Sequence, residues 1–232
     1  MGKPEAVPSD PARLSARPGA APRTPDAREG VHRLGSAWLR VPPGTSLERP
    51  APLVVLLHGA GSSGSAMLGL VGDAMAAAGA LLLAPDSAGR TWDVIETGFG
   101  MDVAAIDAAL AELYARRWVD PAATVLAGFS DGASYALSLG LANGDRFSHL
   151  VAFSPGFVAP VASQGRPPVY VSHGRADPVL PIDRCSRRLV PVLTGRGYEV
   201  HFVEFDGGHG VPPDIAHDAI RWVARTRGGA GG

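Results

Sequence analysis

The chain has 232 residues, of which 46% are hydrophobic, so it can bury a sizeable core, and its length favours one domain over two. Its 21 basic and 22 acidic residues leave a formal net charge of -1, which excludes a strong electrostatic field for nucleic acid or an anionic membrane. The single cysteine, Cys185, excludes an internal disulfide and a cysteine-rich zinc site, and we interpret it as a small helix residue.

The two ends of the chain differ in composition from its middle. Residues 1–29 are rich in proline, alanine and arginine and lack a hydrophobic period, which predicts a disordered tail. Glycine dominates residues 228–232, which predicts a flexible terminus, so the folded domain is expected over 30–227. Apolar runs fall short of the roughly 20 residues of a membrane span, and the N-terminus lacks the apolar core of a secretory signal, so we expect a cytoplasmic protein.

Within the domain, short β-type runs alternate with helical patterns. An antiparallel edge is expected at 31–41, and further strands at 53–57, 80–84, 124–128, 150–153, 169–172 and 199–205. Helices are predicted near 65–78, 102–118, 132–142, 182–194 and 213–226. This alternation is typical of a three-layer α/β fold, in which helices flank a mostly parallel sheet.

A G-x-S-x-G motif, Gly128-Phe129-Ser130-Asp131-Gly132, follows the apolar strand at 124–128 and precedes the predicted helix at 132–142. Glycines at both flanks allow a tight strand-to-helix turn that lifts the serine hydroxyl clear of the sheet. The N-terminus of the following helix favours negative charge at that position. Ser130 is therefore the candidate nucleophile.

A serine hydroxyl is a weak nucleophile and needs a base, which an acid must in turn orient. We expect the base to be His209, because it lies in a glycine-rich loop between the last predicted strand and the last helix. Asp177 is the expected acid, since it follows the strand at 169–172 and gives the chain order Ser, Asp, His. Two rivals are Asp183, expected in the first turn of the next helix, and Asp206, expected to form a turn beside His209.

Cleavage of an ester also needs backbone donors that face the developing oxyanion. The amide of Ala60, in the loop after the strand at 53–57, and the amide of Asp131, after the nucleophile, are predicted to supply them. In the same loop, His58 and Gly59 are expected to brace the backbone rather than to transfer protons. The glycines of this loop lack the lysine and spacing of a phosphate-binding loop.

These motifs resemble the carboxylesterase, phospholipase and acyl-thioesterase branch of the α/β-hydrolases, close also to the dienelactone hydrolases, over roughly residues 30–226. The resemblance is carried by the sequences around His58, Ser130, Asp177 and His209. It implies an eight-stranded type of sheet, a Ser-His-Asp triad without a cofactor, and hydrolysis through an acyl-enzyme. Acyl-protein thioesterases usually carry glutamine where this chain has Asp131, and dienelactone hydrolases use cysteine where it has Ser130.

The substrate pocket is expected to be open. Many lipases of this fold insert a helical lid where residues 158–168 lie, but that segment has only eleven residues, so no lid domain fits and small or short-chain esters are favoured. Trp92 lies in a loop after a strand and either lines the site or packs beneath the loop. Phe157 and Val158 are further pocket candidates.

Several functions remain open at this stage. The primary hypothesis is a serine hydrolase acting on a small-molecule ester, with no metal, nucleotide or flavin cofactor and no nucleic-acid partner. The same triad also fits an acyltransferase, a thioesterase or a peptidase. A non-catalytic binding protein on this fold is the alternative from another class. The oligomeric state is not predicted.

Overall fold

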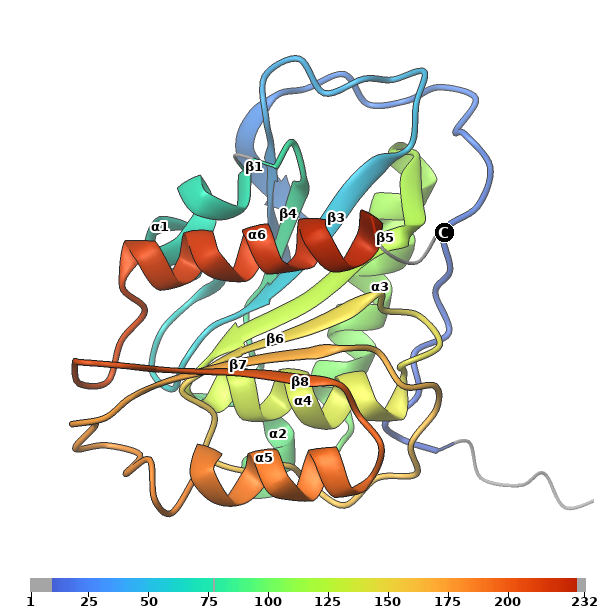
Figure 1. The fold of residues 1–232 in the computed structure, drawn as a ribbon. Coiled ribbons are helices and arrows are strands. Elements are labelled where there is room, and N and C mark those ends of the chain that lie inside the picture. The colour runs from blue at the N-terminus through green and yellow to red at the C-terminus, as the bar shows by residue number, and fades with distance from the viewer. Residues whose placement is uncertain (1–9, 77, 229–232) are drawn as a thin grey trace, which may run out of the picture.

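The computed structural model describes residues 10–76 and 78–228. Its centre is an eight-stranded sheet of order β1-β2-β4-β3-β5-β6-β7-β8 (Figure 1). Strands β1 and β2 pair antiparallel to each other, β2 pairs antiparallel to β4, and the remaining neighbours are parallel. The strands are β1 Gly30–Leu34, β2 Ala37–Val41, β3 Ala51–Leu57, β4 Leu81–Pro85, β5 Val119–Phe129, β6 His149–Phe153, β7 Val169–Gly174 and β8 Val200–Phe205.

Helices cover both faces of the sheet, which confirms the three-layer α/β prediction. In Figure 1, α1 and α6 lie on one face, and α3, α4 and α5 lie on the other. Each helix layer packs against the sheet in its own hydrophobic cluster. The helices are α1 Gly64–Ala76, α2 Asp93–Glu96, α3 Met101–Arg116, α4 Asp131–Ala142, α5 Ser186–Gly195 and α6 Pro213–Gly228.

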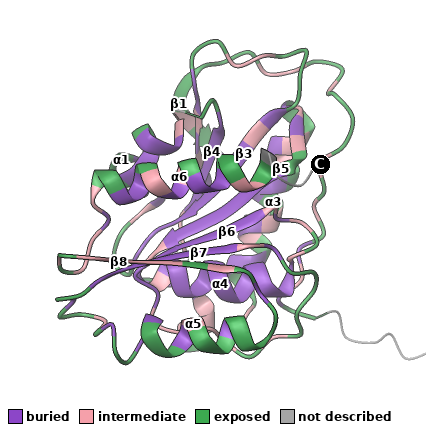
Figure 2. Ribbon diagram, viewed as in Figure 1, coloured by how far each residue is buried: buried purple, intermediate pink, exposed green. Residues whose placement is uncertain are grey.

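The central strands are buried on both faces, so they read as continuous apolar runs rather than alternating ones. All five residues of β4 are buried, as are the last five of β3 (Figure 2). Strand β5 is longer than the predicted 124–128, because Val119 also pairs with Ala51 across a register shift. Helix α4 is buried from Gly132 to its end, as its nearly continuous apolar sequence predicts.

The N-terminal segment differs from the disordered tail that we expected at 1–29. Leu14 is only 1% exposed and belongs to the core cluster beneath α3 and α4. Its amide donates to the Asn143 side chain, and Asn143 donates back to the carbonyl of Ala12. The amides of Ser15 and Ala16 donate to Asp107. A few buried apolar side chains and hydrogen bonds to Asn143 and Asp107 therefore hold this segment in place, although its sequence has no hydrophobic period. Residues 1–9 and 229–232 of the predicted tails lie outside the described residues.

Candidate active site

Ser130 stands at the turn between β5 and α4, in a conformation that only its flanking glycines permit. Its φ is 57°, in the left-handed region that a non-glycine residue adopts at a cost of about 1–3 kcal/mol. A Cβ at Gly128 would lie 2.2 Å from the Gly132 carbonyl oxygen, and a Cβ at Gly132 would lie 2.3 Å from that of Leu57. Both glycines are therefore required by close backbone approach, and the strained turn presents the serine hydroxyl at the carboxyl edge of the sheet.

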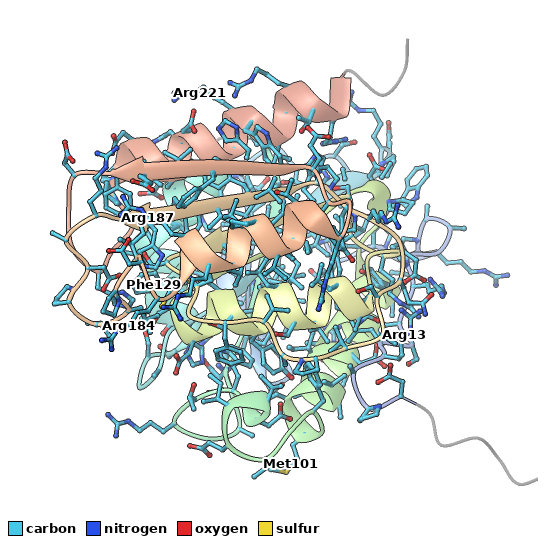
Figure 3. The ribbon with its side chains drawn as sticks, turned by 60° about the horizontal axis from the view of Figure 1, so that its bottom comes forward. Arg13, Met101, Phe129, Arg184, Arg187 and Arg221 are labelled. Atoms are coloured by element: carbon cyan, nitrogen blue, oxygen red, sulfur yellow. The ribbon has the colours of Figure 1, made fainter. Side chains whose placement is uncertain are left out.

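The loop between β8 and α6 brings His209 over Ser130. The Ser130 hydroxyl lies 2.9 Å from His209 Nε2, and His209 Nδ1 lies 2.6 Å from Asp177 Oδ2. Because the Asp177 carboxylate can only accept, Nδ1 carries the proton and Nε2 is left free to accept one from the hydroxyl. The Phe129 ring packs beside the imidazole with centroids 4.8 Å apart, and Figure 3 labels this residue. The three residues from separate loops thus form one hydrogen-bonded chain.

Asp177 is held as a carboxylate by donors on both of its oxygens. Oδ1 accepts hydrogen bonds of 2.8 Å from the amides of Val179 and Leu180, while Oδ2 accepts from His209. Burial by itself raises the pKa of Asp177, but the hydrogen bonds from His209 and the two amides outweigh it, so its net pKa is lowered. The carboxylate is therefore ionised near neutral pH and orients the imidazole.

The two rival acids lie away from His209 and are engaged elsewhere. Asp183 forms an ion pair with Arg187 at 2.8 Å, and Asp206 forms one with Arg175 at 2.7 Å. Both carboxylates are largely exposed. Neither is positioned to orient the imidazole.

A second histidine, whose role the sequence reasoning missed, supports Asp177 from within the core. His173 Nε2 donates to the Leu180 carbonyl at 2.7 Å and lies 3.3 Å from Asp177 Oδ2, while Nδ1 accepts from the Ser186 hydroxyl at 2.7 Å. Burial lowers the pKa of His173, so it is neutral. Its position at the end of a buried strand, four residues before Asp177, is the sequence signal that indicates this role.

The loop after β3 lies directly beside the serine. A Cβ at Gly59 would come within 3.3 Å of Ser130 Cβ, and Ala60 lines the same cavity as Ser130. His58 braces this loop: Nδ1 donates to the Gly59 carbonyl at 2.8 Å, and Nε2 accepts from the Ser87 amide at 3.0 Å. Both ring nitrogens are thereby occupied, so His58 has no free nitrogen for proton transfer.

The second expected oxyanion donor, the amide of Asp131, begins helix α4. Its side chain points to a neighbouring loop, where Oδ2 accepts a 2.7 Å hydrogen bond from the Thr91 hydroxyl. Within residues 10–76 and 78–228, neither the Ala60 amide nor the Asp131 amide donates a hydrogen bond to the protein. Two backbone donors are thus unused on either side of Ser130.

A cavity of about 280 Å³ opens beside Ser130 and His209. Its walls are mostly apolar and come from α1, from the end of β5 and from the loop after Asp177; they include Met67, Leu70, Phe129 and Val179. Leu70 and Val179 are 45% and 61% exposed, so they form a hydrophobic rim. The site therefore favours an apolar group next to Ser130.

The three pocket candidates from the sequence do not line this cavity. Trp92 is fully buried, donates from Nε1 to the His58 carbonyl at 2.8 Å, and packs 5.0 Å from the Tyr135 ring. Of the two roles considered for it, packing beneath the loop is therefore the observed one. Phe157 and Val158 line a separate groove next to α5. The actual walls arise where α1 approaches the sheet, a tertiary contact that local patterns do not reveal.

Comparison with known proteins identifies the family. Residues 93–226, more than half of the chain, match the family model described as Phospholipase/Carboxylesterase. The chain belongs to the phospholipase/carboxylesterase family. The probable feruloyl esterase C of Aspergillus oryzae is 26% identical in an alignment that covers 82% of this chain and 83% of that protein. Feruloyl esterase C of Emericella nidulans is 26% identical in an alignment that covers 85% of this chain and 87% of that protein.

Solved structures agree with this membership. The crystal structure of esterase PE8 is 28% identical, has a TM-score of 0.63, and covers 76% of this chain and 96% of its own. The phospholipase/carboxylesterase from Dyadobacter fermentans supports the fold, with 20% identity, a TM-score of 0.65, and coverage of 86% and 100%. The expected resemblance to α/β-hydrolase esterases is confirmed, and the family member described here is a carboxylic ester hydrolase.

Two further observations concern metal binding and membrane-spanning helices. Among the described residues, no group of three or more histidine, cysteine, aspartate or glutamate side chains is arranged to bind a metal ion. No helix in that part of the chain is long and apolar enough to span a bilayer.

Proposed function

We propose that this carboxylic ester hydrolase acts through a catalytic triad of Ser130, His209 and Asp177 and forms an acyl-enzyme. The observation that carries the proposal is the continuous chain of two hydrogen bonds, 2.9 Å from serine to imidazole and 2.6 Å from imidazole to carboxylate. Its polarity is the one that nucleophilic catalysis needs, because the proton on Nδ1 leaves Nε2 as the acceptor.

In the first half-reaction, Ser130 Oγ attacks the ester carbonyl carbon while its proton passes to His209 Nε2. The carbonyl oxygen becomes an oxyanion, which the unused amides of Ala60 and Asp131 stabilise, each donor contributing roughly 10²- to 10³-fold in rate. The intermediate collapses, the leaving alcohol takes the proton from Nε2, and the acyl group remains on Ser130. Nε2 then takes a proton from water as the water oxygen attacks the acyl-enzyme carbonyl carbon. The bond between that carbon and Ser130 Oγ breaks, Oγ takes the proton back from Nε2, and the acid is released.

Asp177 acts by stabilising the imidazolium that forms in both half-reactions. Its carboxylate is buried and accepts three hydrogen bonds, from the amides of Val179 and Leu180 and from His209 Nδ1, so it is fixed opposite Nδ1. A fixed negative charge in a water-poor site interacts more strongly with a developing positive charge than it would in water. His173 holds that carboxylate in place without titrating itself.

We further propose that the preferred substrates are small esters with a compact apolar acid part. The cavity of about 280 Å³ beside Ser130 is lined by methionine, leucine, phenylalanine and valine side chains. The similarity to proteins named feruloyl esterases suggests ferulate as one candidate acid part. The Asp131 carboxylate is engaged by Thr91, so it does not form part of this wall.

The mechanism is tested by assaying p-nitrophenyl esters of increasing acyl length together with methyl ferulate. Ser130→Ala is expected to lower kcat by roughly 10⁶-fold and to abolish labelling by a fluorophosphonate. Ser163→Ala changes an exposed serine that does not line the cavity, so it serves as the matched control and should retain both activity and labelling. Fluorophosphonate labelling that persists in Ser130→Ala would assign the nucleophile elsewhere and refute the proposed triad.

The chain-length series tests the substrate proposal separately. A cavity of this size predicts the highest kcat/KM for short acyl chains or for the ferulate ester, with a decline for long chains. An optimum at long acyl chains would contradict the compact acid pocket while leaving the triad intact.

A further inference from the structure

A second concave site lies between residues 156–160 and helix α5. It has a volume of about 310 Å³ and shares no lining residue with the cavity beside Ser130. Its floor is apolar and includes Phe157, Val158, Leu189 and Leu193. Val192, which also lines the groove, is 53% exposed, although burial of a valine side chain is energetically favourable. The groove therefore presents hydrophobic surface that a ligand would cover.

Three arginines surround this apolar floor: Arg184, Arg188 and Arg196. Its lining contains no carboxylate, and no aspartate or glutamate of the described residues lies within ion-pair distance of these guanidinium groups. Arg187, on the same helix but outside the groove, is by contrast held by Glu204 at 2.7 Å and by Asp183 at 2.8 Å. Figure 3 labels Arg184 and Arg187. The three arginines of the groove thus have no acidic partner among the described residues, whereas the neighbouring Arg187 is paired.

The helix terminus adds to this imbalance. Arg184 and Arg188 lie at the N-terminal end of α5, whose first turn contains no acidic residue. The helix dipole makes that end partially positive, so cations are unfavourable there and anions are favourable. A bound anion would offset the charge of the arginines and interact favourably with the partial positive charge of this helix end.

We propose that this groove, which we call the arginine groove, binds a small organic carboxylate with an apolar body. Guanidinium groups pair with carboxylates through two parallel hydrogen bonds, so the arginines at the edge of the groove are suited to bind a carboxylate. The apolar body would lie on Phe157, Leu189 and Val192, and the volume fits one small molecule. The acid that ester hydrolysis releases belongs to this chemical class, but the proposal does not rest on that reaction, because the groove is separate from Ser130.

The test measures binding of cinnamate, and of its uncharged amide, to the Ser130→Ala protein, so that hydrolysis plays no part in the result. Isothermal titration gives the affinity, and backbone amide NMR shifts locate the site. Cinnamate is expected to bind with shifts at Leu189 and Val192, more tightly than the amide and less tightly at high salt. Replacing Arg188 by glutamine should weaken binding about tenfold, the loss expected for one charge-assisted pair.

Arg187→Gln is the matched control, since it removes the same charge one position away and should change affinity less than about twofold. Arg184→Gln provides a second variant if Arg188→Gln alters the circular dichroism spectrum. Equal affinity in the Arg184, Arg187 and Arg188 variants would overturn the proposal, as would shifts confined to the cavity beside Ser130. Binding to phosphatidylglycerol vesicles without any response to cinnamate would instead assign the groove to a lipid surface and reject a soluble ligand.

Discussion

The hydrogen bond from Thr91 to Asp131 predicts a measurable link between a side-chain contact and the proposed oxyanion donor. Thr91→Val removes the hydroxyl but keeps nearly the same shape, so the 8% exposed site gains no cavity. The lost bond is 2.7 Å long and charge-assisted, a type that contributes about 1.5–3 kcal/mol. Because Asp131 is only half-buried, we expect the lower end, about 1.5 kcal/mol.

If that energy holds the Asp131 amide in place, its loss acts in the transition state, where the oxyanion forms. A loss of about 1.5 kcal/mol corresponds to a decrease in kcat of roughly tenfold, with KM unchanged. Steady-state kinetics on a p-nitrophenyl ester measures both constants, and Thr91→Ser, which keeps the hydroxyl, should restore kcat. A Thr91→Val enzyme with wild-type kcat, or a Thr91→Ser enzyme as slow as Thr91→Val, would refute this reasoning.

Three further predictions concern the triad, the turn and the pH dependence of stability. Asp177→Asn is expected to keep the fold, as judged by circular dichroism. It should lower kcat by on the order of 10⁴-fold, because the asparagine amide no longer fixes the Nδ1-protonated form of His209. A loss of kcat below tenfold would contradict the role of Asp177. Gly132→Ala should lower the free energy of unfolding, measured in urea, by about 1–3 kcal/mol or more, since the new Cβ would lie 2.3 Å from the Leu57 carbonyl oxygen. An unchanged free energy of unfolding would show that the end of β3 can move to make room for the methyl group. Burial lowers the pKa of His149 to about 4, below its unfolded value near 6.5. The unfolded state therefore binds the proton first, so the stability from neutral His149 is complete above pH 6.5 and decreases by about 3 kcal/mol as the pH falls to 4. His149→Gln should flatten this part of the stability curve, and an equally steep curve in that variant would exclude His149 as the cause.

The proposed triad could be found in the sequence because its signals are local. Ser130 lies in a short motif between a strand and a helix, and both elements have recognisable hydrophobic patterns. His209 and Asp177 each follow a strand, and parallel strands bring their carboxyl ends to one edge of the sheet. Topology therefore converts three separate positions in the chain into one site.

The cavity walls could not be found in this way, because they depend on how elements approach one another. Met67 and Leu70 belong to a helix whose hydrophobic pattern indicates only that one face is buried. Trp92 illustrates the converse, since a tryptophan in a loop fits a ligand wall or a core contact equally well until its Nε1 partner, the His58 carbonyl, is known. His173 lies near the end of a buried strand, but its orientation toward Asp177 depends on a hydrogen bond with Ser186 in the next helix, which the sequence does not reveal.

The N-terminal segment has a consequence for the order in which the chain folds. Leu14 is synthesised before its hydrogen-bond partner Asn143, which follows 129 residues later, and Asp107, the partner of Ser15, follows 92 residues after that serine. These contacts cannot form before α3 and the end of α4 exist, and closing such long loops is slow. The segment around Leu14 therefore stays exposed to protease until β5 and α4 have formed. Nascent chains stalled before Asn143 should be cut by protease near Leu14, whereas longer chains that have folded through α4 should resist cleavage there.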